Sequence, residues 1–217
     1  MKNKTSYPTL DYERWLWTAG CRCVAGLDEV GRGAWAGPVV AAAVILPPGV
    51  PELAESLDGV RDSKMLSAAR REALLPVVQE HAQDWAVGVV APQEIDDMGI
   101  VPATRQAMAL ALQALSPAPD YLLLDHIALP GVPLPQHSLP KGDARVLSIA
   151  AASIVAKVSR DRMMIELAEQ YPGYGFARHK GYGTTAHRVA LADLGPCPVH
   201  RMSFAPLREA SLNQARA

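Results

Sequence analysis

The sequence predicts an α/β fold built as one domain, with or without a small appendage. Short apolar segments rich in valine, leucine and isoleucine alternate with longer segments whose apolar residues recur at helical spacing. At 217 residues, 49% of them hydrophobic, the chain is long and apolar enough to bury a large core. The longest apolar run, roughly residues 34–46, is interrupted by Pro38 and falls short of the about 18 residues that a membrane span needs.

The N-terminus and the cysteines favour a reduced, cytoplasmic protein. The first residues, MKNKTSYPTLDYERW, contain no apolar signal segment, so the expected location is the cytoplasm and no membrane partner is expected. Cys21, Cys23 and Cys197 lack the spacing of a zinc site, which favours free thiols that serve in packing.

Charge is distributed unevenly along the chain. Residues 141–217 hold 11 Lys and Arg against 6 Asp and Glu, a net +5, and residues 1–140 hold 10 against 16, a net −6. A basic portion beside an acid-rich portion is typical of a protein that grips a polyanion near metal-binding carboxylates. A chance asymmetry on a solvated surface is the alternative.

The residues GLDEVGRGAWAGP, 26–38, carry the strongest chemical signal. Residues 24–30 and 38–46 are predicted strands that flank a glycine-rich loop, so we expect an N-terminal hairpin. Asp28 and Glu29 end the first strand, where paired carboxylates can bind a hard divalent cation. A charged turn between two strands is the alternative.

Adjacent acids on one strand pose a geometric problem, because successive side chains of a regular strand point to opposite faces. We expect Gly31 to let the chain twist out of the strand and bring Glu29 back towards Asp28. Gly31 and Gly33, on either side of Arg32, also let backbone amides approach a polar ligand that the guanidinium can hold.

A polar loop and a helix follow. Asp62, Ser63 and Lys64 lie in the loop, where an exposed Ser63 and Lys64 can contact phosphate; a short charged turn is an equal alternative. Ser67 is the predicted N-cap of the helix. Its predicted apolar face holds Ala73, Leu74, Val77, Val78 and His81.

Residues 85–91 predict a third strand that is buried on both faces and ends at Pro92. Glu94, Asp96 and Asp97 follow it and are interpreted as structural, because acids are favourable near a helix N-terminus. The next predicted helix follows Thr104 and places Met108, Ala111, Leu112 and Leu115 on one face.

Residues 121–124, YLLL, predict a short buried strand that ends in Asp125. Active-site groups are common at the carboxyl end of such a strand, although a turn aspartate is the alternative. The proline-rich residues 127–140 predict a loop with a short edge strand at 136–139.

Residues 141–170 predict a long helix with Asp143 at its N-cap position. The small residues 150–153 allow this helix to lie close against the sheet. Asp161 lies one turn after Lys157 and is interpreted as a surface ion-pair partner. Asp143 stands at a helix end that can point at the strand-end carboxylates, so it is the better candidate ligand; a plain helix cap is the alternative.

The C-terminal part mixes aromatic and basic residues with glycines, which suits a mobile loop that contacts nucleic acid. Thr184 is the predicted N-cap of a short helix that ends at Gly195. Arg201 and Ser203 add donors suited to phosphate, and residues 210–217 are predicted to be frayed. The aromatic and basic residues are Tyr171, Tyr174, Phe176, Arg178, His179, Lys180 and Tyr182.

A series of sequence blocks occurs in a characteristic order. They are DEVGRG at 28–33, AGPVVAAAV at 36–44, DSK at 62–64, LLLD at 122–125, KGD at 141–143, SIAAASIVAKVSRD at 148–161, HKGYGT at 179–184 and HRMSF at 200–204. Together they resemble the ribonuclease HII family, the bacterial type 2 ribonucleases H, over about residues 20–208.

The resemblance implies a ribonuclease H-like fold: a mixed five-stranded sheet flanked by helices, with a small helical C-terminal segment that closes over the duplex. One domain is expected over residues 1–217, with its core at about 20–170 and the closing segment at about 171–208. The implied activity is cleavage of the RNA strand of RNA–DNA hybrids. The family also incises duplex DNA 5′ of single embedded ribonucleotides, which leaves 3′-hydroxyl and 5′-phosphate ends and serves ribonucleotide removal.

The resemblance also implies roles for single residues. The family's four metal-binding acids fall on Asp28, Glu29, Asp125 and Asp143, which are expected to hold two Mg²⁺ or Mn²⁺ ions when substrate is bound. Family members recognise the ribonucleotide 2′-hydroxyl with the backbone of Gly31, Arg32 and Gly33, and Tyr182 packs at the RNA–DNA junction. The expected phosphate contacts are Ser63, Lys64, Lys180, Arg201 and Ser203.

Some features depart from the family pattern or leave alternatives open. His126 replaces the glycine that many members have after the LLLD aspartate, and its ring is interpreted as facing solvent. Ribonuclease HIII is disfavoured because it lacks the GRG loop and has an extra N-terminal domain, whereas only about 20 residues precede the first strand here. A related nuclease that needs a run of ribonucleotides and a non-catalytic hybrid-binding module stay open. A monomer is expected, and no sliding-clamp or polymerase partner is identified.

Overall fold

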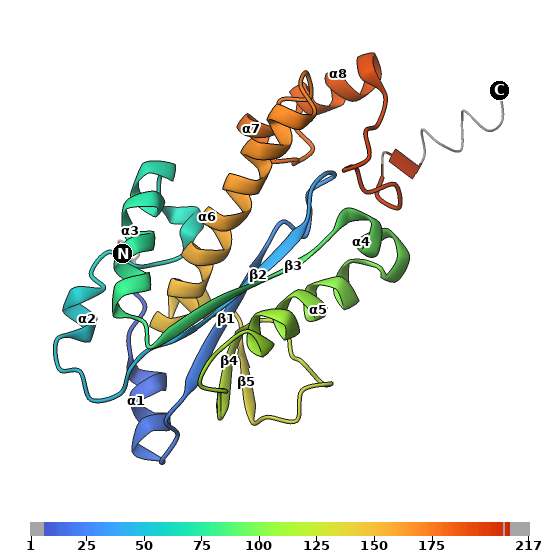
Figure 1. The fold of residues 1–217 in the computed structure, drawn as a ribbon. Coiled ribbons are helices and arrows are strands. Elements are labelled where there is room, and N and C mark those ends of the chain that lie inside the picture. The colour runs from blue at the N-terminus through green and yellow to red at the C-terminus, as the bar shows by residue number, and fades with distance from the viewer. Residues whose placement is uncertain (1–6, 206, 209–217) are drawn as a thin grey trace, which may run out of the picture.

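A mixed five-stranded sheet lies at the centre of the structure (Figure 1). The computed structural model describes residues 7–205, 207 and 208, so the tail 210–217, predicted to be frayed, lies outside it. The strands follow the order β3-β2-β1-β4-β5. Their bounds are β1 Val24–Val30, β2 Val39–Ile45, β3 Asp84–Val90, β4 Tyr121–Asp125 and β5 Gln136–Leu139.

Strand pairing confirms the predicted hairpin and the short edge strand. β1 and β2 pair antiparallel, with Asp28 opposite Ala42, and β4 pairs with β1 in parallel, with Leu124 opposite Leu27. β5 joins β4 in parallel at one edge of the sheet. β3 forms the other edge, so it has a neighbouring strand on one side only. Burial along β3 alternates: Ala86 and Val90 are buried, whereas Val89 is exposed. The prediction that β3 is buried on both faces is therefore wrong.

Helices cover both faces of the sheet (Figure 1). α6 and α3 pack over Ala42 and Val44 of β2, whereas α5 packs over Ala41, Ala43 and Ile45. Alternate side chains of one strand thus enter two separate cores, as the pleat requires. The helices are α1 Asp11–Thr18, α2 Leu53–Ser56, α3 Ala68–His81, α4 Pro92–Met98, α5 Ile100–Gln113, α6 Leu147–Gln170, α7 Phe176–His179 and α8 Thr185–Leu194, and the 3₁₀ turns are η1 Ser63–Met65 and η2 Gly142–Ala144.

Two predicted helix caps are confirmed and one is wrong. The side-chain oxygens of Ser67 and Thr184 each accept a backbone hydrogen bond in the first turn of α3 and α8, both at 3.2 Å. Asp143 does not cap α6, because the chain first makes the turn η2 and the helix begins only at Leu147. The predicted apolar face of α3 is wrong at one position: Ala73 is exposed, and Leu75 is buried beside Leu74 instead.

Two of the acids between β3 and α5, Glu94 and Asp96, are structural, as predicted, whereas Asp97 is exposed. The chain forms the short helix α4 there, before α5 begins at Ile100. Glu94 accepts a hydrogen bond from the backbone N–H of Ala91 at 3.0 Å. Asp96 accepts one from the backbone N–H of Met202 at 2.7 Å, which ties the C-terminal segment to α4.

α6 packs directly on β1, because glycine and other small residues line the contact. A Cβ at Gly26 would lie 2.3 Å from the backbone carbonyl carbon of Ser148, so only glycine permits this approach. The small residues 150–153 are buried at the same interface, as predicted. Glu13 of α1 is buried and accepts a hydrogen bond from the Ser148 N–H at 2.8 Å, so the first turn of α6 finds its acceptor in a distant helix.

The chain beyond α6 packs around its own aromatic cluster near the tip of the β1–β2 hairpin (Figure 1). Tyr174 and Phe176 are buried and stack with ring centroids 5.2 Å apart. The rings of His179, His187 and His200 pack around Phe176. The prediction that Tyr174 and Phe176 are available to nucleic acid in a mobile loop is therefore wrong.

The three cysteines are free thiols, as predicted. Lys157 and Asp161 form the predicted ion pair at 2.7 Å, although both side chains are largely buried. Within residues 7–205, 207 and 208, no helix combines the length and hydrophobicity that crossing a bilayer demands.

Candidate active site

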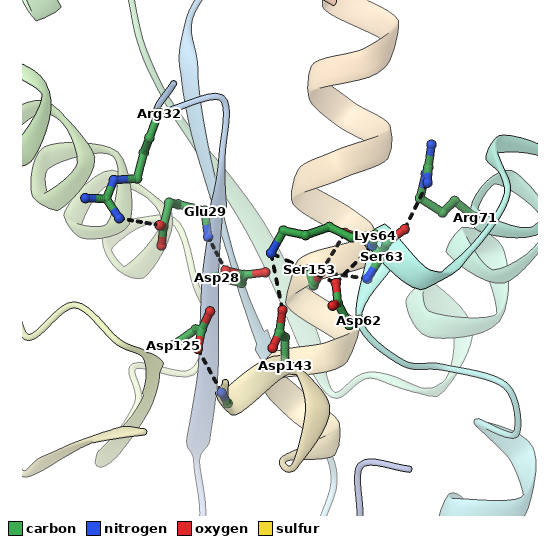
Figure 2. Close-up of polar contacts among 11 residues, drawn as sticks. Asp28, Glu29, Arg32, Asp62, Ser63, Lys64, Arg71, Asp125, Asp143 and Ser153 are labelled. Carbon is green, nitrogen blue, oxygen red and sulfur yellow. Dashed lines mark hydrogen bonds and ion pairs between the residues drawn. The ribbon is translucent and has the colours of Figure 1, made fainter. Parts of the chain in front are cut away.

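Four acidic side chains gather where β1 and β4 separate (Figure 2). Asp28 and Glu29 lie near the end of β1, and Asp125 is the last residue of β4. The pairing of these two parallel strands stops at Leu27 and Leu124, so the sheet opens directly beyond them. Such an opening at the carboxyl ends of strands is a common position for active-site groups in α/β proteins.

Asp28 and Glu29 point to opposite sides of β1, as a regular strand requires (Figure 2). β1 remains paired with β2 as far as Val30, so the prediction that the chain twists out of the strand to bring the two acids together is wrong. Glu29 instead donates its backbone N–H to Asp28 Oδ1 at 2.7 Å and pairs through Oε1 with Arg32 Nη1 at 3.2 Å. The opening beyond β4, and not a twist, makes both acids neighbours of Asp125.

Asp125 fixes the turn that presents the fourth acid. Its Oδ1 accepts a hydrogen bond from the Gly142 N–H at 2.7 Å. A Cβ at Gly142 would lie 2.7 Å from Ile149 Cδ1 of α6 and 3.4 Å from the Asp125 Cα, so the turn packs closely between this helix and the strand end. The turn η2 holds Asp143, which is buried, beside the other carboxylates.

Lys64 extends into the acidic cluster from the opposite wall (Figure 2). Its Nζ lies 3.4 Å from Asp143 Oδ2 and 4.0 Å from Asp62 Oδ1. The preceding residue, Ser63, is buried, and its Oγ accepts a hydrogen bond from Ser153 Oγ at 2.7 Å. The prediction that Ser63 is an exposed phosphate contact is therefore wrong, and Ser63 holds the Lys64 loop against α6.

Burial and mutual repulsion raise the pKa values of three acids. Burial raises the pKa of Asp28 well above its usual range, Glu29 and Asp125 raise it further, and Lys64 opposes this. Burial also raises the pKa of Glu29, against the nearby Arg32. The pKa of Asp143 is raised by burial and then by Asp125. The cluster therefore resists full ionisation unless positive charge is added.

Two acids of the cluster, Asp125 and Asp143, line a cleft of about 520 Å³. Asp62, Lys64, Asp125 and Asp143 contribute to its walls, together with His126. His126 is exposed, as predicted, and has a φ of 60°, in the left-handed region that favours glycine.

The oxygen atoms of the cluster fit a hard divalent cation such as Mg²⁺ or Mn²⁺. Glu29 Oε2 is buried and finds no hydrogen-bond partner among the described residues, so it is free to ligate. In the same part of the chain no three His, Cys, Asp or Glu side chains lie close enough together to hold one ion. Since Mg²⁺ keeps several waters and binds partly through substrate phosphate, such a site is completed by substrate.

The side chain of Arg201 holds the glycine-rich loop through hydrogen bonds to its backbone carbonyls. This arginine is fully buried and donates from Nη1 to the Arg32 carbonyl at 3.0 Å and from Nη2 to the Gly37 carbonyl at 2.8 Å. Its donors face the protein, so the prediction that Arg201 offers them to phosphate does not match the structure. Ser203 is exposed, but its hydroxyl donates to Asp96 at 2.6 Å.

The loop of residues 180–183, which follows α7, lies beside the glycine-rich loop. Trp35 N–H donates to the Gly181 carbonyl at 2.8 Å, which places Lys180 and Tyr182 beside residues 35 and 36 of that loop. Sequence reasoning missed two residues of this region: Asp62, an acid of the cleft wall, and Arg160, a buried arginine of α6 that contacts both loops. For Arg160 the signal available was a charged residue on the buried face of a predicted helix.

Comparison with known proteins agrees with this geometry. The family model for ribonuclease HII matches residues 25–207. Ribonuclease HII of Roseiflexus castenholzii is 57% identical over 204 residues, which cover 94% of this chain and 91% of the relative. The enzyme of Chloroflexus aurantiacus is 53% identical over 206 residues, or 95% of this chain and 97% of the relative.

The fold is also similar to that of a solved ribonuclease H structure. The crystal structure of ribonuclease H2 from Pyrococcus horikoshii superposes with a TM-score of 0.75 at 25% identity, and the match covers 90% of this chain and all of the other. The five-stranded mixed sheet with its helices is thus the expected ribonuclease H-like fold. The chain belongs to the ribonuclease HII family, whose members are divalent-metal-dependent endonucleases that act as ribonucleases H on RNA–DNA hybrids.

Proposed function

We propose that this protein incises duplex DNA on the 5′ side of a single embedded ribonucleotide, in addition to cleaving the RNA strand of RNA–DNA hybrids. The products would carry 3′-hydroxyl and 5′-phosphate ends, as ribonucleotide removal from DNA requires. The single observation that carries the proposal is the position of the carboxylate cluster beside the loop of Gly31, Arg32 and Gly33, joined to it through the Glu29–Arg32 ion pair.

Asp28, Glu29, Asp125 and Asp143 are the residues that would hold two divalent ions, Mg²⁺ or Mn²⁺, when substrate is bound. Two such ions supply activation of the attacking water and stabilisation of the leaving oxygen in phosphodiester hydrolysis. The protein orients its ligands beforehand: Gly142 N–H holds Asp125, and the Glu29 N–H holds Asp28. Lys64 places a cation beside Asp143, where it can meet a phosphate of the substrate.

Selection for a ribonucleotide needs groups that contact the 2′-hydroxyl, the feature that distinguishes RNA from DNA. Gly33 is exposed and has no atom within 4 Å of its missing Cβ, so a ligand can approach the backbone of the loop there. Gly31 has a φ of 91° and is buried, with its missing Cβ position against Arg160. A site built to hydrogen-bond a hydroxyl rejects the analogue without it by about 10⁴ or more. Tyr182, which is half-buried beside this loop, would pack at the RNA–DNA junction.

The proposed phosphate contacts are Lys64 and Lys180, together with Arg32. Ser63 and Arg201 would act indirectly, since both are buried and hold the loops in place. Ser203 would reach phosphate only by giving up its hydrogen bond to Asp96. We place this activity in a single-domain monomer in the cytoplasm, with residues 171–208 closing over the duplex.

The test uses purified protein, Mg²⁺ and a labelled DNA duplex that contains one ribonucleotide, with an all-DNA duplex as control. A single nick 5′ of the ribonucleotide, with a 3′-hydroxyl end and no cutting of the control, is the expected result. Cutting only of substrates with several consecutive ribonucleotides would replace the proposal by a run-dependent nuclease. Tight binding without cutting in either Mg²⁺ or Mn²⁺ would replace it by a hybrid-binding module.

A further inference from the structure

The two loops that would read the ribonucleotide are distant in sequence but share one support. The first loop, residues 31–38, follows β1, and the second, residues 180–183, follows α7. They are joined directly by hydrogen bonds from the N–H groups of Trp35 and Ala36 to the Gly181 carbonyl, at 2.8 and 3.3 Å. Beneath both loops lies the side chain of Arg160, from the middle of α6.

Arg160 is fully buried, and its guanidinium group donates hydrogen bonds to both loops. Nε donates to the Pro38 carbonyl at 2.9 Å and Nη2 to the Ala36 carbonyl at 3.1 Å, both in the first loop. Nη1 donates to the Lys180 carbonyl at 2.9 Å, in the second loop. The guanidinium carbon also lies 5.4 Å from the centre of the Tyr182 ring.

Three glycines in the two loops leave no room for a side chain, because α6 or the other loop lies directly against them. A Cβ at Gly31 would lie 2.2 Å from Arg160 Nε, and one at Gly37 would lie 2.2 Å from Met164 Sδ, one turn further along α6. A Cβ at Gly181 would lie 2.3 Å from the Ala36 carbonyl oxygen, so it would push the two loops apart. Each of these glycines has a φ between 80° and 91°, which other residues rarely adopt.

Arg160 makes these contacts without a carboxylate partner. The adjacent acid, Asp161, pairs with Lys157 and Arg71 instead, and no acid lies within ion-pair distance of Arg160 in the described part of the chain. A buried arginine bound only to carbonyl oxygens is costly for stability, so stability alone does not explain its presence. Its planar set of five donors can fix the relative position of three carbonyl groups, which a lysine cannot do.

We propose that Arg160 is a positioning residue that holds the 31–38 loop and the 180–183 loop at one fixed spacing, and thereby selects the cleavage position at a single ribonucleotide. The inference rests on the proposed function, because it assigns the two loops to the 2′-hydroxyl and to the RNA–DNA junction. A single embedded ribonucleotide offers one productive position, which requires both loops at once. A long hybrid offers many equivalent positions, so its cleavage depends less on their spacing.

The test compares Arg160→Lys and Gly181→Ala with wild type on three substrates: a duplex with one ribonucleotide, a duplex with four consecutive ribonucleotides and a long RNA–DNA hybrid. Arg160→Lys keeps the charge but loses the fork of donors, and Gly181→Ala separates the loops while leaving Arg160 intact. Arg162→Gln is the matched control, because Arg162 is also on α6 but is exposed and pairs only with Glu72. Thermal unfolding of each variant reports whether it is folded at the assay temperature.

For Arg160→Lys and Gly181→Ala we expect the ratio of kcat/KM on the single-ribonucleotide duplex to kcat/KM on the long hybrid to fall about 10- to 100-fold. A displacement of a positioning group by about 1 Å can cause a loss of this size. Within the run of four ribonucleotides, cleavage should spread over several positions. Arg162→Gln should keep the ratio and the cleavage position of wild type. If Arg160→Lys proves unfolded, Gly181→Ala alone decides the question by the same two readouts.

An equal loss of activity on all three substrates, with cleavage still at one position, would overturn the inference and leave Arg160 as a stabilising residue only. Wild type itself separates this failure from that of the proposed function. If wild type fails to nick the single-ribonucleotide duplex but cleaves the long hybrid, the proposed function is wrong and the role of Arg160 in selecting the position falls with it.

Discussion

Lys64 influences the ionisation of the carboxylate cluster directly. Burial lowers its pKa, yet the neighbouring Asp28, Asp143 and Asp62 together raise that pKa above its ordinary value. The influence is reciprocal, because Lys64 lowers the pKa of both Asp28 and Asp143. The ammonium group therefore offsets part of the effect of burial and shifts the ionisation of these two acids to lower pH, although the pKa of each stays above its ordinary value.

Replacing Lys64 by Met should shift the acidic limb of the pH–activity profile to higher pH. Without the ammonium group the pKa values of Asp28 and Asp143 rise, so a higher pH is needed to expose the carboxylates to metal ions. The profile of kcat/KM against pH on a long hybrid measures this shift, with Lys64→Arg as the control that keeps the charge. An acidic limb at the same pH in Lys64→Met and wild type would contradict the electrostatic role.

In the absence of metal ions, the ionised Asp28 side chain should lower the free energy of unfolding. Since folding raises its pKa, the folded state binds a proton more tightly than the unfolded state, and stability falls as the pH rises from about 4 through the raised pKa. In chelator at pH 7, Asp28→Asn should therefore raise Tm by about 2–4 °C, the shift that about 1 kcal/mol produces in a chain of this size. The gain should vanish near pH 4, where wild type is protonated too.

Asp161→Asn is the matched control for this experiment. Asp161 is also largely buried, but it is paired with Lys157 and Arg71, so its replacement removes favourable contacts and should lower Tm. A lower Tm in Asp28→Asn at pH 7 would show that Asp28 contributes to stability like a paired acid. The account would then be wrong about the cost of assembling the cluster.

Among the elements, α6 connects most of the site. Its first turn lies against β1, its middle carries Arg160 beneath both loops, and its upper half reaches the C-terminal segment (Figure 1). The sequence pattern identified this helix and its small residues, because periodicity is a local property. It did not reveal that Glu13 of α1 supplies an acceptor at the start of the helix, because that contact joins residues far apart in the chain.

The closeness of α6 and β1 can be tested at Gly26. A Cβ there meets the backbone of Ser148 at 2.3 Å, and backbone cannot move aside as a side chain can. Gly26→Ala should therefore destabilise the protein by about 1–3 kcal/mol or more, measured by urea unfolding. Gly131→Ala is the control, since no atom lies within 4 Å of its added Cβ. Equal stability of the two variants would contradict the tight helix–sheet contact.

The histidine cluster of the C-terminal segment should make that segment sensitive to acid. Burial lowers the pKa of His187 from 6.5 to about 4, and its Nε2 lies 3.0 Å from His200 Nε2. Because the unfolded state takes up this proton first, stability should fall as the pH drops from about 6.5 towards 4, by at most about 3 kcal/mol for this residue.

His187→Gln tests this expectation by comparison at two pH values. At pH 7 the variant should be less stable than wild type, because the buried ring packs against Phe176 and Trp35. At pH 4.5 the difference in unfolding free energy should narrow, because only wild type still has to keep an imidazole neutral at this position. Urea unfolding at both pH values gives the two differences. A difference of the same size at both would show that His187 does not couple folding to pH.

On the scale of the whole molecule, local pattern and long-range contact explain what the sequence could predict. The strand ends marked Asp28, Glu29 and Asp125 as candidates, because the end of an apolar run is visible in the sequence. Asp143 was predicted to lie beside these acids, where the structure places it, but for a wrong local reason, since it sits in a 3₁₀ turn and not at a helix cap. Lys64 among the acids and Arg160 beneath the loops are products of tertiary packing, which periodicity does not encode.

The central claim is that the carboxylate cluster is the catalytic centre. The most direct test is single-turnover cleavage, in Mg²⁺, of a duplex with one ribonucleotide by wild type, Asp125→Asn and Asp97→Asn. Asp97 is the control because it is an exposed acid of α4 outside the cluster. We expect Asp125→Asn to cut at least about 100-fold more slowly while it still binds the duplex, and Asp97→Asn to match wild type. Cleavage by Asp125→Asn at the wild-type rate would contradict the account.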